Sequence, residues 1–263
     1  MKAEWEGKMT TAVLQVETLC KSFGGVQAIR DLSFTVRAGE VLGLIGPNGS
    51  GKSTTVNVLT GTLPPTSGKI ILAGAPIHAL PEYDRVALGL TRTFQTASVF
   101  PEFTVREQIE LGCNVTRTSH PLSSVFGIGR HAGEDEAASA RVKDILALTG
   151  LGAVAGDKVG AISSAQQRFL MIATALAAKP KVMLLDEPAA GLVSHERKTL
   201  GAMIKAIRDG GVSVLVIEHH MGLIMDVCDR ICVLNFGSKI AEGAPAEIRN
   251  DRAVIDAYLG EAA

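Results

Sequence analysis

The stretch that decides the fold is Val41-Leu42-Gly43-Leu44-Ile45-Gly46-Pro47-Asn48-Gly49-Ser50-Gly51-Lys52-Ser53. Its continuously apolar first part, Val41 to Ile45, is typical of a strand that is buried on both faces. The remainder matches G-x-x-x-x-G-K-[ST], a loop whose glycines let backbone N–H groups approach phosphate oxygens. Thr54 to Leu59 contains no helix breaker, so we expect a helix whose positive end faces the same anion.

Phosphate contacts are expected along the whole loop. Lys52 would neutralise the outer phosphates, and the hydroxyl of Ser53 would reach Mg²⁺. A chance glycine-rich turn before a helix is the alternative, and the agreement of strand, loop, lysine and hydroxyl argues against it. The residues assigned to nucleotide binding here are Gly46, Pro47, Asn48, Gly49, Ser50, Gly51, Lys52, Ser53 and Thr54.

A second motif ends another apolar run. Val182 to Leu185 predicts a buried strand, and Asp186 and Glu187 follow directly. An Asp at a strand tip beside bound phosphates can hold Mg²⁺, and the neighbouring Glu can orient or deprotonate the attacking water. The alternative is that two acids merely end a strand before the turn at Pro188, which the phosphate loop disfavours. Together the two motifs predict a P-loop nucleoside triphosphatase.

The last third of the chain has an α/β rhythm. Helices are expected at Gln166 to Ala178 and His195 to Arg208, and strands at Val182 to Leu185 and Val212 to Ile217. Alternation of this kind predicts a mostly parallel sheet with crossover helices.

The first two thirds differ from this rhythm. Short β-prone runs at Val13 to Val16 and Leu32 to Val36 indicate an antiparallel sheet near the start. Further along, Thr104 to Gly112 and Glu136 to Leu148 have helical apolar spacing. The segment from His120 to Gly133 has no clear period and predicts a loop or insertion.

Composition excludes several classes of protein. The 263 residues include 26 Lys+Arg and 27 Asp+Glu with no long run of one sign, so we expect no nucleic-acid partner. Cys20, Cys113, Cys228 and Cys232 form no paired CxxC pattern, which indicates free thiols in a reducing compartment. Met1 to Thr10 lacks a secretory apolar core, and no apolar run approaches the roughly 20 residues of a membrane span.

Four further segments, in order along the chain, narrow the class. They are Thr91-Arg92-Thr93-Phe94-Gln95, Ser163-Ser164-Ala165-Gln166-Gln167-Arg168, Pro188-Ala189-Ala190-Gly191-Leu192 and Val216-Ile217-Glu218-His219. They resemble segments of ABC ATPases, and the resemblance covers nearly the whole chain. It is closest to the ATPases of branched-chain amino acid importers, to which the insertion near His120 to Gly133 and the ending Ala257-Tyr258-Leu259-Gly260-Glu261-Ala262 are also similar.

The resemblance implies roles for single residues. Phe23 is similar to the aromatic that stacks on adenine, with a plain packing residue as the alternative. Gln95 resembles the glutamine that senses Mg²⁺ and the attacking water, with a solvated loop amide as the alternative. His219 resembles the switch histidine that contacts the γ-phosphate. The expected catalytic set is therefore Glu187, His219 and Gln95, and the expected metal set is Ser53, Gln95 and Asp186.

The signature loop departs from the family pattern. In that family, L-S-G-G-Q of one subunit covers the nucleotide of the other, and here Ser163, Ala165 and Gln166 would bind it. Ala165 replaces the second glycine of this pattern. A glycine there lets backbone N–H groups approach the phosphate and tolerates positive φ, and a methyl group opposes both. We therefore expect a weakened signature. A small backbone shift that accommodates the methyl group is the alternative. Val193-Ser194 is a second departure, because Asn-Pro is usual there.

The fold expected is α/β, a RecA-like P-loop core of mainly parallel sheet with an N-terminal antiparallel β subdomain and an inserted α-helical subdomain. We expect one ABC-type domain. Its parts are an extension at 1–10, a core at about 11–95 and 179–240, a helical subdomain at about 96–178 and a tail at about 241–263.

The resemblance implies a subunit that binds ATP and Mg²⁺ and powers import of branched-chain or other hydrophobic amino acids. Its partners would be a second, identical or different, ATPase subunit, integral permease subunits and, indirectly, a solute-binding protein. Its place would be peripheral, on the cytoplasmic face of the inner membrane. Alternatives are an ATPase for lipid or lipopolysaccharide export, an ABC-type protein of translation or DNA repair, and a regulatory subunit with weak hydrolysis.

Overall fold

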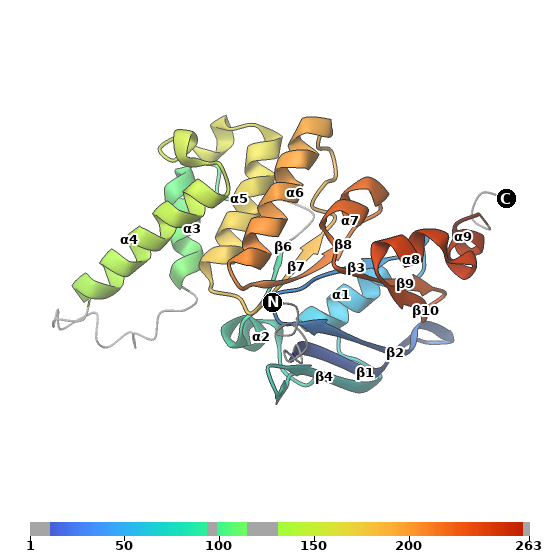
Figure 1. Ribbon diagram of the computed structural model, residues 1–263. Helices are drawn as coiled ribbons and strands as arrows, with labels where there is room; N and C mark the ends of the chain where they lie inside the picture. Colours follow the sequence, from blue (N-terminus) through green and yellow to red (C-terminus); the bar gives the residue numbers. More distant parts are fainter. Residues whose placement is uncertain (1–10, 94–98, 115–130, 260–263) are drawn as a thin grey trace, which may run out of the picture.

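The computed structural model describes residues 11–93, 99–114 and 131–259 (Figure 1). Gln95, the extension at 1–10 and most of the expected insertion lie outside these ranges. Two sheets with helices packed on them make up the described part. The α/β fold expected from the sequence is confirmed.

The central sheet consists of β3 (Val41–Ile45), β6 (Leu90–Thr93), β7 (Val182–Asp186), β8 (Ser213–Ile217), β9 (Arg230–Asn235) and β10 (Ser238–Gly243). Its order is β10-β9-β3-β8-β7-β6. All neighbours are parallel except β10, which pairs antiparallel with β9 at one edge. β3, β7 and β8 are buried along their whole length, which is why their sequences are almost continuously apolar.

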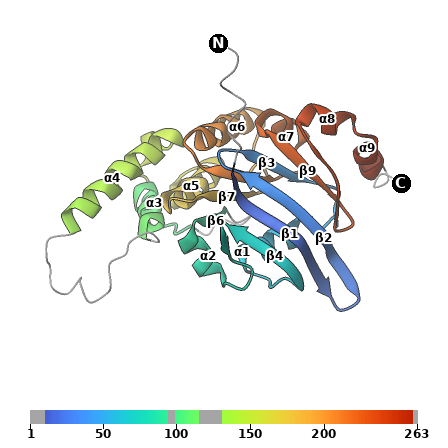
Figure 2. The ribbon, with the colours of Figure 1, turned by 60° about the horizontal axis from the view of Figure 1, so that its bottom comes forward.

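The second sheet consists of β1 (Ala12–Phe23), β2 (Val26–Arg37), β4 (Ser67–Leu72) and β5 (Ala75–Pro76). It is antiparallel, in the order β2-β1-β4-β5. Figure 2 shows β2, β1 and β4 side by side as a layer of their own. The antiparallel sheet expected near the start is therefore present, and β1 and β2 extend well beyond the runs that indicated them.

The faces of the central sheet pack against two different cores. Leu42 and Leu44 share a buried cluster with Leu14 and Ile70 of the antiparallel sheet. Val41 and Ile45 belong instead to a cluster with the helices on the other face. The alternation follows from strand geometry, because successive side chains point to opposite faces. Both faces are therefore covered, as a parallel sheet requires.

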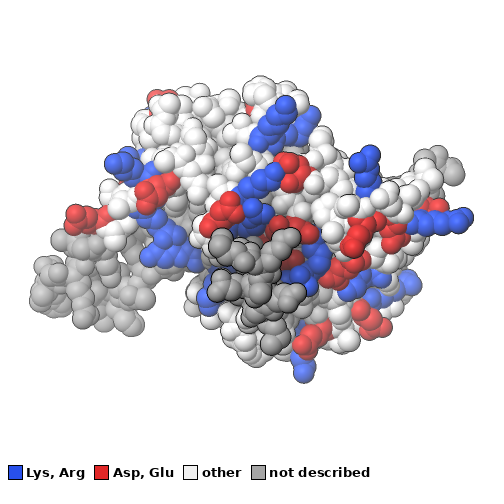
Figure 3. Space-filling view, viewed as in Figure 1, with Lys and Arg blue, Asp and Glu red and all other residues white. Residues whose placement is uncertain are grey.

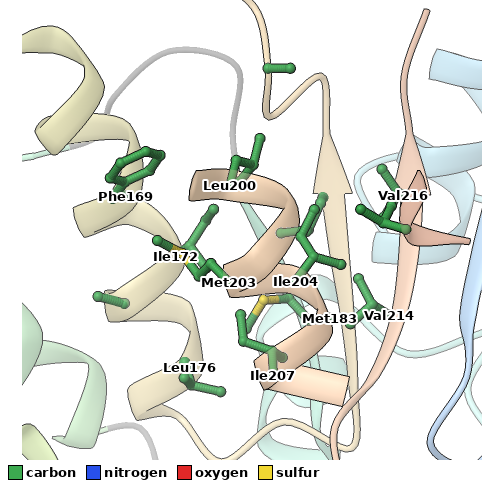
Figure 4. Close-up of a cluster of buried hydrophobic side chains, with 14 of the residues drawn as sticks. Phe169, Ile172, Leu176, Met183, Leu200, Met203, Ile204, Ile207, Val214 and Val216 are labelled. Atoms are coloured by element: carbon green, nitrogen blue, oxygen red, sulfur yellow. The ribbon is translucent and has the colours of Figure 1, made fainter. Parts of the chain in front are cut away.

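On the helical face, α5 (Ser164–Ala177) and α6 (Ser194–Asp209) pack buried apolar side chains into the core. In Figure 4, Ile204 and Ile207 of α6 lie beside Met183 of β7, and Phe169, Ile172 and Leu176 lie along α5. Before them in the chain come α1 (Lys52–Thr60), α2 (Glu82–Leu88), α3 (Val105–Asn114), α4 (His131–Leu148) and the short 3₁₀ turns Gly152–Val154 and Val159–Ala161. α3, α4 and α5 form a helical part at one side of the molecule (Figure 1).

Helix α4 begins earlier than the sequence indicates. It starts at His131, so the expectation that residues 131–133 belong to a loop was wrong. The apolar spacing that predicts this helix begins only near Val142, and Gly133 is read as a breaker. Once part of a long helix is packed, its outer turns continue without an apolar stripe of their own.

The described part of the expected tail contains two helices. After α7 (Met221–Val227), β9 and β10 come α8 (Pro245–Asn250) and α9 (Arg252–Leu259), at the right in Figure 1. None of the helices in the described part combines the length and hydropathy needed to cross a bilayer. On the face shown in Figure 3, basic and acidic side chains are interspersed.

Candidate nucleotide-binding site

The expected site residues meet at one edge of the central sheet, where the carboxyl ends of its parallel strands lie. Leu44 of β3 and Asp186 of β7 both pair with Ile217 of β8, so the segments after these strands begin side by side. They are the phosphate loop, the acidic pair and Glu218-His219. Open α/β sheets bind ligands at this edge. The fold thus brings together groups that lie far apart in the sequence.

Glycines shape the backbone of the phosphate loop. A Cβ atom on Gly46 would lie 2.1 Å from the carbonyl oxygen of Leu234, and one on Gly51 would lie 2.6 Å from that of Ala28. Gly49 has φ 73°, and no described heavy atom lies within 4 Å of its Cβ position. Packing within the chain therefore requires the first two glycines. Gly49 leaves its side of the loop open, as close approach of a phosphate requires.

The start of helix α1 is suited to an anion. No side chain caps the helix, and its first turn has no acidic residue. Lys52 lies in that turn, and its Nζ donates to the carbonyl oxygens of Gly46 and Pro47 at 2.7 and 2.8 Å. The helix dipole and the lysine charge both attract an anion here. These features support the assignment of phosphate contacts to this loop.

Asp186 is almost fully buried, at 2% exposure. Its Oδ2 accepts a hydrogen bond from Arg92 Nη2 of β6 at 2.7 Å. Arg92 Nη1 donates to Asn57 Oδ1 of α1 at 2.8 Å. One guanidinium group thus ties the carboxylate to the helix that follows the phosphate loop. Sequence reasoning quoted Arg92 within a motif but assigned no role to it.

The oxygen donors at this edge fit Mg²⁺. The Ser53 hydroxyl and the Asp186 carboxylate are hard ligands of the kind that Mg²⁺ prefers. In the described part of the chain, no cluster of three or more His, Cys, Asp or Glu residues could hold a metal ion. Because Mg²⁺ is usually held by one or two protein oxygens together with substrate phosphates, the residues fit an ion that arrives with nucleotide. Gln95, the other expected ligand, lies outside the described residues.

Glu187 follows Asp186 in the left-handed backbone region, with φ 48°. Its N–H donates to the carbonyl oxygen of Ile217 at 2.9 Å, and its own carbonyl oxygen accepts from Arg168 Nη1 of α5 at 3.2 Å. Non-glycine residues in this region are uncommon and cluster at functional sites. The half-buried Glu187 side chain therefore extends from a backbone that is held on both sides.

A buried carboxylate beside the acidic pair was quoted in the sequence without a role. Glu218 is 1% exposed, and its Oε1 accepts the N–H of Ala189 at 2.7 Å. Its Oε2 accepts the N–H groups of His219 and His220 at 3.0 Å each. Hydrogen bonds to a charged group stabilise by about 1.5–3 kcal/mol each. Glu218 therefore joins the turn after Glu187 to the loop that carries His219.

The two histidines of that loop differ in their surroundings. The His219 side chain is 68% exposed at the sheet edge, where it can reach a ligand. His220 Nδ1 accepts the N–H of Leu223 at 3.2 Å and so caps α7. Histidine is an uncommon residue at this position, because Asn, Asp, Ser and Thr are the usual caps.

The signature loop forms the start of α5. Ser163 Oγ accepts the N–H of Gln166 at 3.2 Å, and Gln166 Oε1 accepts the N–H of Ser163 at 2.9 Å, which together make a capping box. Ala165 lies in the first turn of the helix and is not among the described residues with positive φ. Its methyl group is buried in the helical core. The backbone at residue 165 is therefore one that alanine adopts without strain, and the weakened signature stays a prediction.

Phe23 ends β1 and pairs with Val26 in the hairpin to β2. The ring is 46% exposed, and Lys21 Nζ lies 5.0 Å from its centroid. Two residues after Val26, the carbonyl oxygen of Ala28 lies 2.6 Å from where a Cβ atom on Gly51 of the phosphate loop would be. Phe23 is thus on a hairpin that adjoins the loop, and it is not a core packing residue.

Val193 and Ser194 lie at the start of α6. Val193 precedes the helix, is half exposed, and its N–H donates to Glu196 Oε2 at 2.8 Å. Glu196 thus makes its half of a capping box, and the Val193 side chain has no oxygen to make the other half. The unusual residues thus leave α6 with one of the two contacts of a capping box.

Comparisons with known proteins identify the family of the chain. Sequence models of two families match, "ABC transporter" over residues 29–190 and "Branched-chain amino acid ATP-binding cassette transporter" over residues 238–263. The branched-chain amino acid transport ATP-binding protein BraF of Pseudomonas aeruginosa is 37% identical over 97% of this chain and 100% of the relative. LivG of Escherichia coli is 36% identical with the same coverage. The lipopolysaccharide export protein LptB of Haemophilus influenzae is 33% identical over 95% of this chain and 98% of the relative.

Solved structures support the same relationship. The ADP conformation of an ATP-binding cassette of an ABC transporter has a TM-score of 0.81 and 30% identity, covering 95% of this chain and 100% of that one. A nucleotide-free cassette from an ABC transporter has a TM-score of 0.78 and 30% identity, covering 94% and 99%. With a phosphate loop, an acidic strand tip and a histidine loop at one sheet edge, the chain belongs to the family of ABC transporter ATP-binding proteins.

Proposed function

We propose that this chain binds ATP with Mg²⁺ and hydrolyses it to power an importer of branched-chain or other hydrophobic amino acids. The observation that carries the proposal is the arrangement at the carboxyl edge of the central sheet. There the phosphate loop follows β3, Asp186 and Glu187 stand at the end of β7, and His219 follows β8, which pairs with both of the other strands. Binding and hydrolytic groups can therefore act on one nucleotide.

Each residue has a distinct task in this proposal. Backbone N–H groups of the loop and Lys52 stabilise charge on the phosphate oxygens. Ser53 and Asp186 hold the Mg²⁺ ion, which when bound offsets charge on the outer phosphates. Glu187 accepts a proton from the attacking water. His219 donates a hydrogen bond to the γ-phosphate, with its loop positioned by Glu218.

The transported solute is proposed from the relatives and from the C-terminal segment. BraF and LivG are named as branched-chain amino acid transport proteins and match over their full length. Residues 238–263 match the sequence model of that transporter group. Export of lipopolysaccharide, as named for LptB, rests on a slightly lower identity. Uptake of a hydrophobic amino acid is therefore the better supported function.

Membrane subunits are proposed to dock at a cavity between the central sheet and the helical part. Its volume is about 320 Å³, and it is lined by residues of α2, β6, α3 and α5. Phe100 at its mouth is 55% exposed. The hydroxyl oxygens of Thr91 and Thr93 are buried without a hydrogen-bond partner among the described residues. An apolar cavity with unsatisfied polar groups suits an inserted element that brings a partner for them.

The test uses the complex purified with its own membrane subunits. Glu187→Gln is expected to lower ATP turnover by at least about 100-fold, because the proton acceptor is lost. ATP affinity should stay within about threefold of the unaltered protein, since the loop contacts remain. Uptake of leucine into proteoliposomes should fall with turnover. Unchanged turnover would overturn the catalytic assignment, and recovery of no integral membrane subunit would overturn the transport proposal.

A further inference from the structure

Arg92 connects three parts of the site, and nothing in the expected mechanism uses it. It lies on β6, the edge strand of the central sheet, with a side chain that is 13% exposed. One arm of its guanidinium group donates to Asp186 Oδ2 at 2.7 Å, and the other donates to Asn57 Oδ1 at 2.8 Å. The carboxylate at the expected metal site is thus already paired with a cation of the chain itself.

Because the Asp186 carboxylate is buried, it needs the Arg92 partner when no nucleotide is bound. Asp186 is 2% exposed, and a buried carboxylate without a partner costs several kcal/mol. A planar guanidinium holds the carboxylate and Asn57 in one fixed geometry, whereas the donors of a lysine ammonium rotate freely. Arg92 therefore lets Asp186 be both charged and fixed at the strand tip before any ligand arrives.

The same pairing opposes binding of a bare metal ion. A divalent cation at Asp186 would lie close to the positive charge of Arg92, at a place where little water screens the repulsion. Nucleotide phosphates would reverse the balance, because they bring several negative charges to the adjacent loop. The cation would then be held by the phosphates as well as by the protein.

We propose that Arg92 is a resident counter-ion of Asp186 that makes binding of the divalent cation conditional on nucleotide. This rests on the proposed assignment of Asp186 to Mg²⁺. Arg92 acts through Asp186 and is a positioning residue. It excludes the metal from the nucleotide-free site and keeps the carboxylate oriented for the metal that comes with ATP.

The contrasting explanation is that the Arg92–Asp186 pair only stabilises the fold. A second buried ion pair of the chain serves as the control. Arg230 Nη1 lies 2.7 Å from Glu40 Oε1, and the two side chains are 11% and 7% exposed. This pair joins β9 to the start of β3, away from the carboxyl edge of the sheet. Arg230→Gln removes a similar buried cation without touching the proposed metal site.

The experiment measures Mn²⁺ binding to the full chain by electron paramagnetic resonance, without nucleotide and with ATP. For Arg92→Gln without nucleotide, the Mn²⁺ dissociation constant should fall at least about tenfold, because the repelling charge is gone. Saturating Mn²⁺ should also raise the melting temperature of this variant, since the ion replaces the lost partner of Asp186. Arg230→Gln should show neither effect.

Two further variants separate the explanations. Arg92→Lys keeps the charge and should stay within about threefold of the unaltered chain in nucleotide-free Mn²⁺ affinity. The double variant Arg92→Gln with Asp186→Asn should lose the gained affinity. Unchanged Mn²⁺ affinity in Arg92→Gln, or an equal gain in Arg230→Gln, would overturn the proposal. A different result would overturn the proposed assignment of Asp186 to the metal, namely Mn²⁺ binding in the presence of ATP that is as tight in Asp186→Asn as in the unaltered chain.

Discussion

At the scale of single residues, the site is organised by groups that do not touch the nucleotide in the proposed mechanism. Glu218 joins the turn after Glu187 to the histidine loop through three backbone N–H groups. Arg168 holds the carbonyl of Glu187, and His220 caps the helix that comes after the loop. Precise placement of reacting groups depends on such supporting contacts.

Glu218→Gln tests this support. The amide has one accepting oxygen, so its NH₂ group must face at least one of the backbone N–H donors. We expect the melting temperature to fall and kcat for ATP hydrolysis to drop by about tenfold or more, while ATP affinity changes by less than about threefold. Steady-state turnover measures the loss of kcat, and stopped-flow nucleotide binding measures the ATP affinity.

A matched control comes from the C-terminal part of the chain. Glu247 Oε2 accepts the N–H of Ala244 at the start of α8, with an N–O distance of 2.8 Å. This contact is exposed, and it lies far from the site in the sequence. Glu247→Gln should leave kcat unchanged. Equal kcat losses in the two variants would mean that carboxylate caps act only through overall stability.

At the scale of elements, the start of α5 decides how the signature departure should be interpreted. The Ser163 and Gln166 side chains cap the helix, and Ala165 packs its methyl group into the helical core. A backbone in the first turn of a helix keeps its N–H groups directed out of the helix end whether residue 165 is Gly or Ala. The structure therefore favours the view that the alanine is accommodated.

Ala165→Gly is thus expected to destabilise the chain without improving catalysis. Loss of helix propensity and of a buried methyl group should lower the free energy of unfolding by about 1–2 kcal/mol. ATP turnover of the complex purified with its partner ATPase subunit should not rise. Urea unfolding and turnover measure the two quantities, and a severalfold increase in turnover would restore the weakened-signature hypothesis.

At the scale of the whole molecule, two buried cores share the central sheet. Cys228 belongs to the core under the helices and Cys232 to the core under the antiparallel sheet. Burial raises the pKa of each thiol to about 12. Each therefore reports on opening of a different face.

These thiols should be inert while the protein is folded. At pH 8 a pKa of about 12 leaves roughly one part in 10⁴ as thiolate, the reactive form. Iodoacetamide followed by peptide mass spectrometry should modify the partly exposed Cys20 and spare Cys228 and Cys232. In urea all of these should react. Fast native labelling of Cys232 but not of Cys228 would mean that the antiparallel sheet opens separately.

Much of the fold was predictable because its signals are local. The apolar run before Gly46 predicted a strand and a phosphate loop after it, and the run before Asp186 predicted a strand that ends in two acids. β9 and β10, in contrast, were not predicted, although Ile231 and Val233 are buried in the core. No functional motif marks them, and short apolar runs are ambiguous between strand and buried helix until their neighbours are known.

The sequence by itself determined the phosphate loop, the acidic pair and the family, because these depend on residue types at fixed spacing. Only the tertiary structure decided that Arg92 pairs with Asp186, that Glu218 joins two loops and that the Ala165 methyl group points into the core. The physical reason is that a contact between distant segments depends on strand order and on side-chain direction. Spacing along the chain contains neither, whereas a packed sheet specifies both.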